Sequence, residues 1–319
     1  MAKVKAAKVK SKKFTFDDLE LVLLSLPTVI WYAVFSFLPM FGVILAFKEF
    51  RISDGSKSFV YNLLQSEGTG FKNFQFLFSN TSSWVMIRNT LVYNLIFIVL
   101  GVIIPVSLAI MISNLYSQKF AKVCQTAMFL PHFMSWVVAA YFLFGFLSSE
   151  HGLVNSMIKS FSGGDGINWY GESAVPYWPF ILIIMNLWKG TGYGMVVYLA
   201  SITGIDSTYY EAAVIDGATK WQQVTKITLP LLKSIIIIMF IMNVGKIFNS
   251  DFGLFYQVPR NSGELEKATL TVDVQVYNMM TKLGDIGMSS AAAFFQSICG
   301  CITILIANTI VKKVDEESA

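Results

Sequence analysis

The residues of this chain best placed to do chemistry are polar side chains that recur at helical spacing inside apolar segments. Asn186, Lys189 and Tyr193 follow one another at intervals of three and four residues. This spacing places all three on one face of a helix. A lysine at the centre of a membrane helix costs about 2.5–3.5 kcal/mol on insertion scales, so we expect this face to meet a cavity or a partner helix. The chemistry available there is hydrogen bonding to a polar ligand.

A second apolar segment has a similar polar face. Asn243, Lys246 and Asn249 follow at three-residue intervals, with Asp251 just beyond. We expect the two faces to line one pathway. In the alternative interpretation, the amides and lysines bridge helices or pair with Asp251.

The sequence contains no recognisable catalytic constellation. His132 and His151 are the only histidines, and neither belongs to a serine–histidine–aspartate or zinc-ligand pattern. A phosphate-binding loop requires G-x-x-x-x-G-K-[ST], whereas Gly245-Lys246 is followed by Ile247. We therefore expect no catalytic residue, no metal site and no bound cofactor in this chain, and any ATP hydrolysis would occur on another subunit.

The composition indicates a membrane protein. Of 319 residues, 55% are hydrophobic and 14% are charged, and the mean hydropathy is +0.58. Such a chain lacks the polar surface of a soluble domain. A helix needs roughly 20 residues to cross a core of about 30 Å. The segments of sufficient length are 20–47, 87–115, 122–147, 176–202, 232–257 and 287–311. We predict an all-α integral membrane protein with six transmembrane helices.

The lysines predict the orientation of these spans. If the six spans alternate, lysines concentrate on one side: in the tail 1–18, after span two, in the loop 203–231 and at the C-terminus. The positive-inside rule then places both termini and that loop in the cytoplasm. Residues 19–313 would form the membrane domain and 314–319 a short tail. No aromatic-basic module accompanies the lysines, so we expect contact with anionic lipid rather than nucleic acid.

A polar island, 210–231, separates the fourth and fifth predicted spans. Thr208 and Glu211 have the spacing of a capping box, which predicts the start of a helix. Gly217 can adopt the left-handed conformation that ends one. A second helix is predicted over 220–227, before a proline. The island should form a short rigid elbow against the membrane face.

The order and spacing of Glu211-Ala212-Ala213, Gly217 and Ile227-Thr228-Leu229-Pro230 resemble the cytoplasmic EAA loop of permease subunits in ATP-driven (ABC) importers. The resemblance implies a type I ABC importer permease fold, in which this loop is a coupling helix that docks in a cleft of the ATPase subunit. The residues that it assigns to ATPase coupling are Tyr210, Glu211, Ala212, Ala213, Asp216, Gly217, Ala218, Ile227, Leu229 and Pro230. Ser207 and Tyr209 depart from the proline and leucine of many relatives. A capped helix without a partner is the alternative.

Four further segments narrow the resemblance. These segments are 129–147, 186–202, 248–263 and 284–297. Together they resemble carbohydrate-uptake permeases, particularly those that import oligosaccharides or polysaccharide fragments. The resemblance covers about 19–313. It implies a bacterial cell-membrane complex that works by alternating access. The implied partners are a second homologous permease chain, two ATPase subunits that bind ATP and Mg, and an extracellular solute-binding protein.

A sugar cargo would suit the polar faces, because hydroxyl groups exchange hydrogen bonds with amides and charged groups while sugar rings stack on aromatic rings. The candidate path residues are Trp136, Asn186, Trp188, Lys189, Tyr193, Asn243, Lys246 and Asn249. Gly190, Gly192 and Gly194 predict either a bent helix or close helix packing. An amino-acid or phosphate permease, or a secondary transporter, remains the alternative.

Overall fold

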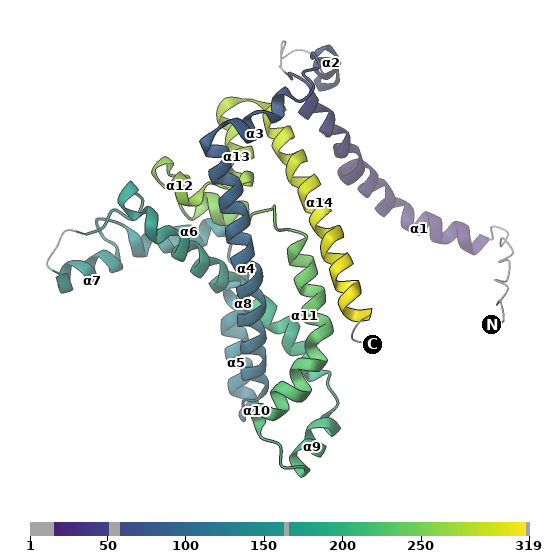
Figure 1. Ribbon diagram of the computed structural model, residues 1–319, viewed down its shortest axis with the longest axis vertical. Coiled ribbons are helices and arrows are strands. Elements are labelled where there is room, and N and C mark those ends of the chain that lie inside the picture. Colours follow the sequence, from purple (N-terminus) through teal and green to yellow (C-terminus); the bar gives the residue numbers. More distant parts are fainter. Residues whose placement is uncertain (1–15, 51–57, 163–165, 317–319) are drawn as a thin grey trace.

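The computed structural model describes residues 16–50, 58–162 and 166–316, which are helical apart from turns, extended connections and one isolated β-bridge. The long helices stand side by side in a bundle, from which α6 and α7 project sideways (Figure 1). The α-helices are α1 (Phe16–Tyr32), α2 (Phe59–Gln65), α3 (Phe76–Ser79), α4 (Thr81–Ser113), α5 (Gln118–Phe129), α6 (Trp136–Leu147), α7 (Leu153–Ser162), α8 (Trp178–Thr203), α9 (Ser207–Ile215), α10 (Lys220–Gln223), α11 (Leu229–Val244), α12 (Glu266–Thr269), α13 (Val272–Asn278) and α14 (Ile286–Glu316).

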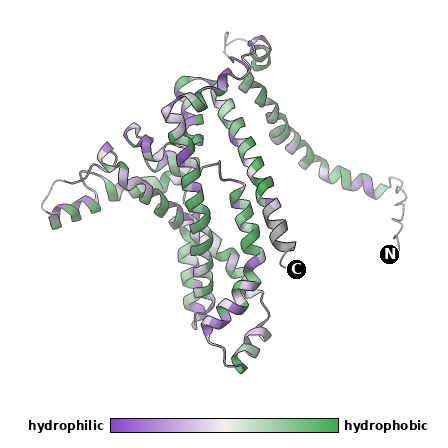
Figure 2. Ribbon diagram, viewed as in Figure 1, coloured by the Kyte–Doolittle hydropathy of each residue, from purple (hydrophilic) through white to green (hydrophobic). Residues whose placement is uncertain are grey.

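The membrane-spanning capacity of the described chain agrees with the predicted class. Five helical stretches are long and apolar enough to cross a bilayer, namely Asp18–Phe47, Thr81–Ser113, Glu172–Thr203, Lys220–Val244 and Ile286–Thr309. A bent pair of helices would supply the sixth span. The hydrophobic colours follow the long helices, and hydrophilic colours concentrate near the ends of the bundle (Figure 2). The all-α multi-span membrane class is confirmed.

The two predicted tails are only partly covered by the structure. Most of the basic tail 1–18 lies outside the described residues, which begin at position 16. At the other end, α14 continues to Glu316, beyond the predicted end of the last span at position 311. The helix thus includes the first half of the predicted tail 314–319.

The third predicted span, 122–147, is wrong as a single straight helix. The chain bends by 101° between Gln118–Phe133 and Trp136–Leu147. Pro131 lies just before the bend and has no N–H to donate to a helix. At the bend, Ser135 starts α6, since its Oγ accepts a hydrogen bond from Val138 N at 3.2 Å. With 12 residues, α6 rises about 18 Å, and it runs sideways from the bundle (Figure 1).

The fifth predicted span, 232–257, is displaced along the chain. The continuous helical stretch is Lys220–Val244, and the chain then leaves the helix. The backbone carbonyls freed by this unwinding find a side-chain partner on α4, because Asn94 Nδ2 donates to Ile247 O at 2.8 Å and to Asn249 O at 3.2 Å. The predicted helical face of Asn243, Lys246 and Asn249 is therefore a helix end followed by a turn.

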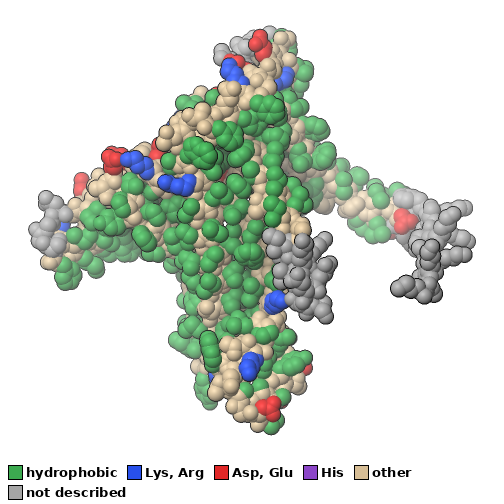
Figure 3. Space-filling view, in the orientation of Figure 1, with side chains coloured by type: hydrophobic (Ala, Val, Ile, Leu, Met, Phe, Trp, Pro, Cys, Tyr) green, Lys and Arg blue, Asp and Glu red, His purple; other side chains and the backbone are tan. Residues whose placement is uncertain are grey.

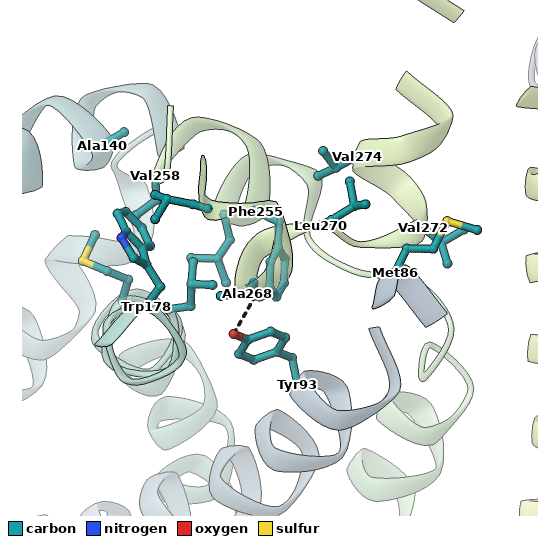
Figure 4. Packing of buried hydrophobic residues seen from close by; sticks show 14 of the residues in the cluster. Met86, Tyr93, Ala140, Trp178, Phe255, Val258, Ala268, Leu270, Val272 and Val274 are labelled. Carbon is teal, nitrogen blue, oxygen red and sulfur yellow. Dashed lines mark hydrogen bonds between the residues drawn. The ribbon is translucent and has the colours of Figure 1, made fainter. Parts of the chain in front are cut away.

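A buried apolar cluster fixes the end of the bundle at which α8 begins. Trp178, the first residue of α8, packs there with Val258 and Phe255 (Figure 4). Tyr93 Oη on α4 donates to Ala268 O at 2.8 Å, which attaches α12 to this cluster. A second cluster, around Met195 and Leu232, packs α4, α8 and α11 together nearer α9.

Two of the three glycines of the fourth span, Gly192 and Gly194, allow close packing, one of the two predicted alternatives, whereas a Cβ atom on Gly190 would meet nothing within 4 Å. α8 is unbroken from Trp178 to Thr203. A Cβ atom on Gly192 would collide with the carbonyl oxygen of Met128. Glycine is required there because the last turn of α5 crosses α8 at backbone distance.

The first span is as little buried as Lys220–Val244, and both are less buried than the other long segments of the described chain. α1 leans away from the bundle (Figure 1), and only 11% of its most apolar window is buried within this chain. Leu24 is 78% exposed and Trp31 is 61% exposed. An apolar helix of this kind needs lipid or another protein chain around it.

Candidate functional site

The predicted elbow forms at one end of the bundle, where α9 is the outermost helix (Figure 1). Its first cap differs from the predicted Thr208–Glu211 capping box. Asp206 is the N-cap, and its Oδ1 accepts a hydrogen bond from Thr208 N at 3.0 Å. Hydrogen bonding from Thr208 lowers the pKa of the Asp206 carboxyl below its ordinary value. The predicted helix start is therefore misplaced by two residues.

The predicted end of α9 is confirmed. Gly217 has a φ of +77°, in the left-handed region that favours glycine. Its N–H donates to Val214 O at 3.0 Å, while Ala218 N donates to Ala213 O at 2.8 Å. These two bonds form a Schellman motif, which satisfies the last carbonyls of the helix and turns the chain sharply.

The second half of the elbow continues into the membrane. Thr219 and Gln222 form a capping box at the start of α10, which confirms the predicted start at Lys220. The prediction that this helix ends before Pro230 is wrong. The helix continues through a π-helical turn, Val224–Thr228, into α11. Pro230 is tolerated because it lies in the first turn of α11, next to this local change in winding.

Most of the surface of α9 is exposed. The helix buries none of its residues. Glu211 and Ala212 are exposed, Ala213 is half-buried, and Ile215 is 86% exposed. Trp221 on α10 adds a second large exposed apolar side chain, at 74%.

The remaining elbow residues connect it to the bundle. Tyr210 Oη and Thr228 Oγ1 are in hydrogen-bond contact at 2.9 Å, so α9 is attached to the π-helical turn below α11. Leu229 packs into the apolar cluster around Met195 and Leu232. Of the other coupling candidates, Asp216 and Pro230 are exposed, and Ala218 and Ile227 are half-buried.

A central cavity of about 490 Å³ lies between α4, α8, α11 and the turn that follows α11. The structure brings five of the eight predicted path residues together in its lining: Asn186, Tyr193, Asn243, Lys246 and Asn249. Polar residues that were not among those candidates also line the cavity, namely Asn94, Thr191, Ser250 and Asp251. Amide, hydroxyl and charged groups therefore converge on one hollow in an otherwise apolar bundle.

The other three path candidates lie outside this lining. Trp188 faces a separate apolar hollow beside Pro131. Lys189 Nζ donates to His132 O at 3.1 Å and lies 5.2 Å from the centre of the Trp136 ring. It therefore bridges α8 to the bend after α5, as in the helix-bridging interpretation. Trp136 Nε1 donates to Asp251 Oδ2 at 2.7 Å, at the edge of the cavity.

Of the two charged side chains in the cavity lining, Asp251 has hydrogen-bond partners and Lys246 has none among the described residues. Asp251 accepts from Trp136 Nε1 and, at 3.3 Å, from Leu254 N. Within the described part of the chain, the Lys246 side chain makes no ion pair or hydrogen bond, and the residue is exposed and lines the cavity. Two amides from different helices, Asn186 and Asn243, face the same space. The cavity thus offers an unpaired cation beside hydrogen-bonding amides.

Sequence reasoning missed the residues that hold the turn after α11 in place. Ser250 N and Oγ both donate to Asp273 Oδ2 at 2.7 Å. Gln296 Nε2 on α14 donates to Phe248 O at 2.6 Å and to both Asp273 oxygens at 3.1 Å. The available signal was that Gln296 and Asn94 are polar residues inside apolar spans, where such residues tend to have a specific partner.

The structure contains no group of three or more His, Cys, Asp or Glu side chains that could hold a metal ion among its described residues. Charged side chains gather at the two ends of the bundle and along one side of the α6–α7 arm, and apolar side chains cover the middle (Figure 3). A membrane bundle with a polar cavity and a capped, exposed elbow defines the class of multi-pass membrane permeases.

Comparison with known proteins gives the family. Residues 101–316 match the binding-protein-dependent transport system inner membrane component, and this chain belongs to that family. The polygalacturonan/rhamnogalacturonan transport system permease protein YteP of Bacillus subtilis (strain 168) is 32% identical over 93% of this chain and 89% of its own length. The lactose transport system permease protein LacF of Rhizobium radiobacter is 30% identical over 68% and 71% of the two chains.

Solved structures agree with this assignment. A chain of a bacterial ABC transporter involved in the import of the acidic polysaccharide alginate superposes with a TM-score of 0.82 at 30% identity, over 93% of this chain and 96% of that chain. A second structure contains the alginate transporter in complex with an alginate pentasaccharide-bound periplasmic protein, with a TM-score of 0.81. The predicted permease family and type I importer fold are confirmed.

Proposed function

We propose that this chain is the permease subunit that moves an oligosaccharide or polysaccharide fragment into the cell, driven by ATPase subunits that grip its elbow. The sugar class is supported by relatives that match nearly the whole chain, including the polygalacturonan/rhamnogalacturonan permease and the alginate importer. ATP and Mg would be bound by the ATPase subunits. The orientation that the lysines predict places α9 in the cytoplasm, where those subunits are.

One observation carries the coupling proposal: the elbow and the cavity share a continuous helical element. α9 is attached through Tyr210 to Thr228, within the helical stretch Lys220–Val244. That stretch contributes Met239 and Asn243 to the cavity wall. A displacement of α9 by an ATPase subunit would therefore move one wall of the cavity.

This arrangement suits alternating access. Alternating access needs a bundle with two conformations. A partner at either end can favour one conformation only if its contacts with the bundle differ between the two. ATP-driven closure of the ATPase pair would move the elbow, and a loaded solute-binding protein would act at the opposite end. In this chain, α11 and its following turn transmit the movement, and the cavity amides bind the cargo.

The exposed first span supports a second permease chain as partner. α1 has little contact with its own bundle, although its side chains are apolar over most of its length. Packing it against a homologous chain would cover this surface and complete the wall around the cargo path. The full proposed complex contains two permease chains, two ATPase subunits and a solute-binding protein.

The unpaired lysine supports an acidic cargo. Lys246 faces the cavity without a carboxylate partner among the described residues, and a sugar carboxylate would supply one. Two unit charges 4 Å apart attract by roughly 4 kcal/mol at an effective dielectric constant of 20. Two of the similar transporters import acidic polysaccharides, polygalacturonan and alginate, by their names.

The coupling proposal is tested by reversing the charge of Glu211 in the complete complex in proteoliposomes. Glu211→Lys should leave the chain inserted and the basal ATPase activity present, but strongly reduce sugar uptake per ATP hydrolysed. Glu150→Lys is the matched control, because Glu150 is 85% exposed and lies between α6 and α7, away from the elbow. Unaltered uptake per ATP in Glu211→Lys contradicts the coupling role.

The cargo proposal is tested with two probes of similar length, trigalacturonate and maltotriose. Lys246→Gln removes a charge-assisted hydrogen bond worth about 1.5–3 kcal/mol, which corresponds to at least about tenfold. We expect this loss for trigalacturonate and not for maltotriose, and we expect Lys246→Arg to retain most of the wild-type uptake. Equal uptake of trigalacturonate by wild type and Lys246→Gln contradicts an acidic cargo at this position.

A further inference from the structure

A second hollow of about 200 Å³ lies beside the bent end of the third span. Its lining comes from one face of α6 and from the π-helical segment Gly253–Gln257 with the residues that follow it, and includes Val137, Tyr141, Phe144, Tyr256, Gln257 and Arg260. Pockets for drug-sized ligands have roughly 300–1,000 Å³. The hollow is therefore suited to a single sugar unit.

The backbone at the edge of this hollow is strained. Arg260 and Asn261 are consecutive non-glycine residues with left-handed φ values of 56° and 48°. Non-glycine residues rarely adopt this conformation, and such strain persists where the surrounding structure fixes it, often at binding sites. The turn is held by Arg260 N donating to Gln257 O and Asn261 N donating to Tyr256 O, both at 3.0 Å.

The turn holds Arg260 over an aromatic ring. The guanidinium carbon lies 4.2 Å from the centre of the Phe144 ring. Among the described residues, the side chain has neither an acidic partner nor a hydrogen-bond acceptor. Stacking leaves the guanidinium edge, with its fork of N–H donors, available to a ligand. Arg260 thus resembles Lys246 in being an unpaired cation that faces a hollow.

A tyrosine behind the hollow adds an unsatisfied hydroxyl. The rings of Tyr170 and Phe144 lie 5.5 Å apart. Tyr170 Oη is buried without a hydrogen-bond partner among the described residues. Burial raises the pKa of Tyr170 to about 12, and the nearby Arg260 opposes that rise. The hydroxyl therefore stays protonated beneath the Phe144 ring on which Arg260 stacks.

Two residues, Asp251 and Trp136, connect the wall of the central cavity to the wall of this hollow. Asp251 lines the central cavity, and the segment Gly253–Gln257 that begins two residues later contributes Tyr256 and Gln257 to the second hollow. Trp136 donates to Asp251, and the next residue, Val137, lines the second hollow. The Trp136 ring also packs against Gly253, at the start of the segment that lines the second hollow.

The second hollow lies farther from the elbow than the central cavity does. Ala140, which lines it, packs in the cluster that contains Trp178 and Val258 (Figure 4). Trp178 begins α8, and the other end of α8 leads to α9. A cargo that enters from the side opposite the elbow would meet this hollow before the central cavity.

We propose that this hollow is a second glycan-binding subsite, which holds one acidic sugar unit of a chain whose neighbouring units occupy the central cavity. The Arg260 guanidinium would bind the sugar carboxylate through paired N–H donors. The exposed ring of Tyr141 would stack on the apolar face of the sugar, and the Gln257 amide would bond its hydroxyl groups. This inference rests on the proposed acidic cargo.

The test measures binding of digalacturonate and tetragalacturonate to the purified complete transporter in lipid nanodiscs, without the solute-binding protein. The shorter probe reports on the central cavity, and the longer one reaches both subsites. In wild type, tetragalacturonate should bind more tightly. Arg260→Asn removes the charge while keeping a residue that tolerates a left-handed φ, and it should reduce the ratio of the two affinities by about tenfold. Arg260→Lys should reduce it less.

Further variants separate this inference from the cargo proposal. Tyr141→Ala removes an exposed ring, at 67%, and should also lower the affinity ratio, and Lys246→Gln should weaken both probes. A wild-type affinity ratio in Arg260→Asn and in Tyr141→Ala overturns the second subsite, even if Lys246→Gln still weakens both probes and so supports an acidic cargo. Failure of wild type to bind either probe overturns the acidic cargo and the subsite together.

Discussion

Replacing Gly217 perturbs the elbow through the backbone alone. A Cβ atom at this position would meet nothing within 4 Å, but the φ of +77° is strained for any other residue. Alanine in the left-handed region costs roughly 1–2 kcal/mol, which lowers the population of the formed turn by about 5–30-fold. Proline cannot adopt this φ and loses the N–H that donates to Val214 O, so its effect should exceed about 100-fold. Asparagine tolerates the left-handed region and should have the smallest effect.

The assay is sugar uptake per ATP hydrolysed by the complete complex in proteoliposomes. If the elbow transmits the ATPase movement, this ratio should fall in the order Gly, Asn, Ala, Pro, while the amount of inserted chain stays constant. Gly204→Ala is the matched control. Gly204 has a φ of −83°, and a Cβ there would make an ordinary contact of 3.5 Å with Ser201 O.

The order of the variants is the decisive result. A proline variant with wild-type uptake per ATP would refute the reasoning, since the turn could not have formed. A uniform loss in all three variants and in Gly204→Ala would indicate general damage to the loop and would equally contradict a role for the left-handed turn.

Two further predictions concern stability. Tyr93→Phe removes the hydroxyl that donates to Ala268 O and leaves a buried carbonyl unsatisfied, so unfolding should become easier by about 1–3 kcal/mol; an unchanged thermal midpoint in detergent would contradict this. The pKa of Asp206 is lowered by hydrogen bonding, so its stabilisation of α9 should be complete above the ordinary value of 3.8 and be lost as the pH falls through the lower folded value. Asp206→Ala should therefore speed amide exchange in the first turn of α9 at pH 6, whereas Asp206→Asn should not, because asparagine is an equally good cap; equal exchange in wild type and Asp206→Ala would contradict the cap.

Local signals in the sequence were sufficient for the class of protein and for the elbow. Apolar length predicts spans because lipid requires it, and Gly217 predicts the turn because few other residues tolerate its φ. The start of α9 was misplaced because Asp206 and Thr208 are both good caps two residues apart. The carboxylate at position 206 is the side chain that accepts the hydrogen bond from the backbone.

Long-range contacts determined what the sequence did not predict. The end of α11 depends on Asn94, which is more than 150 positions away along the chain from Asn249. The bend after α5 occurs inside an apolar run that a hydropathy average reads as one span. Helical spacing placed Lys189 on the same face as Asn186 and Tyr193, but its long side chain reaches His132 O instead of the cavity. Spacing gives the face of a helix, and the neighbouring chain decides where a flexible side chain binds.

The central claim, that α9 transmits ATPase movement to the cavity, is tested most directly by cross-linking. In the purified complex, a cysteine in place of the exposed Ala212 should cross-link to an ATPase subunit, with a yield that changes when ATP is bound, and should be labelled by membrane-impermeant reagents only from the cytoplasmic side. Labelling from the opposite side, or the absence of any cross-link to an ATPase subunit in every nucleotide state, would contradict the claim.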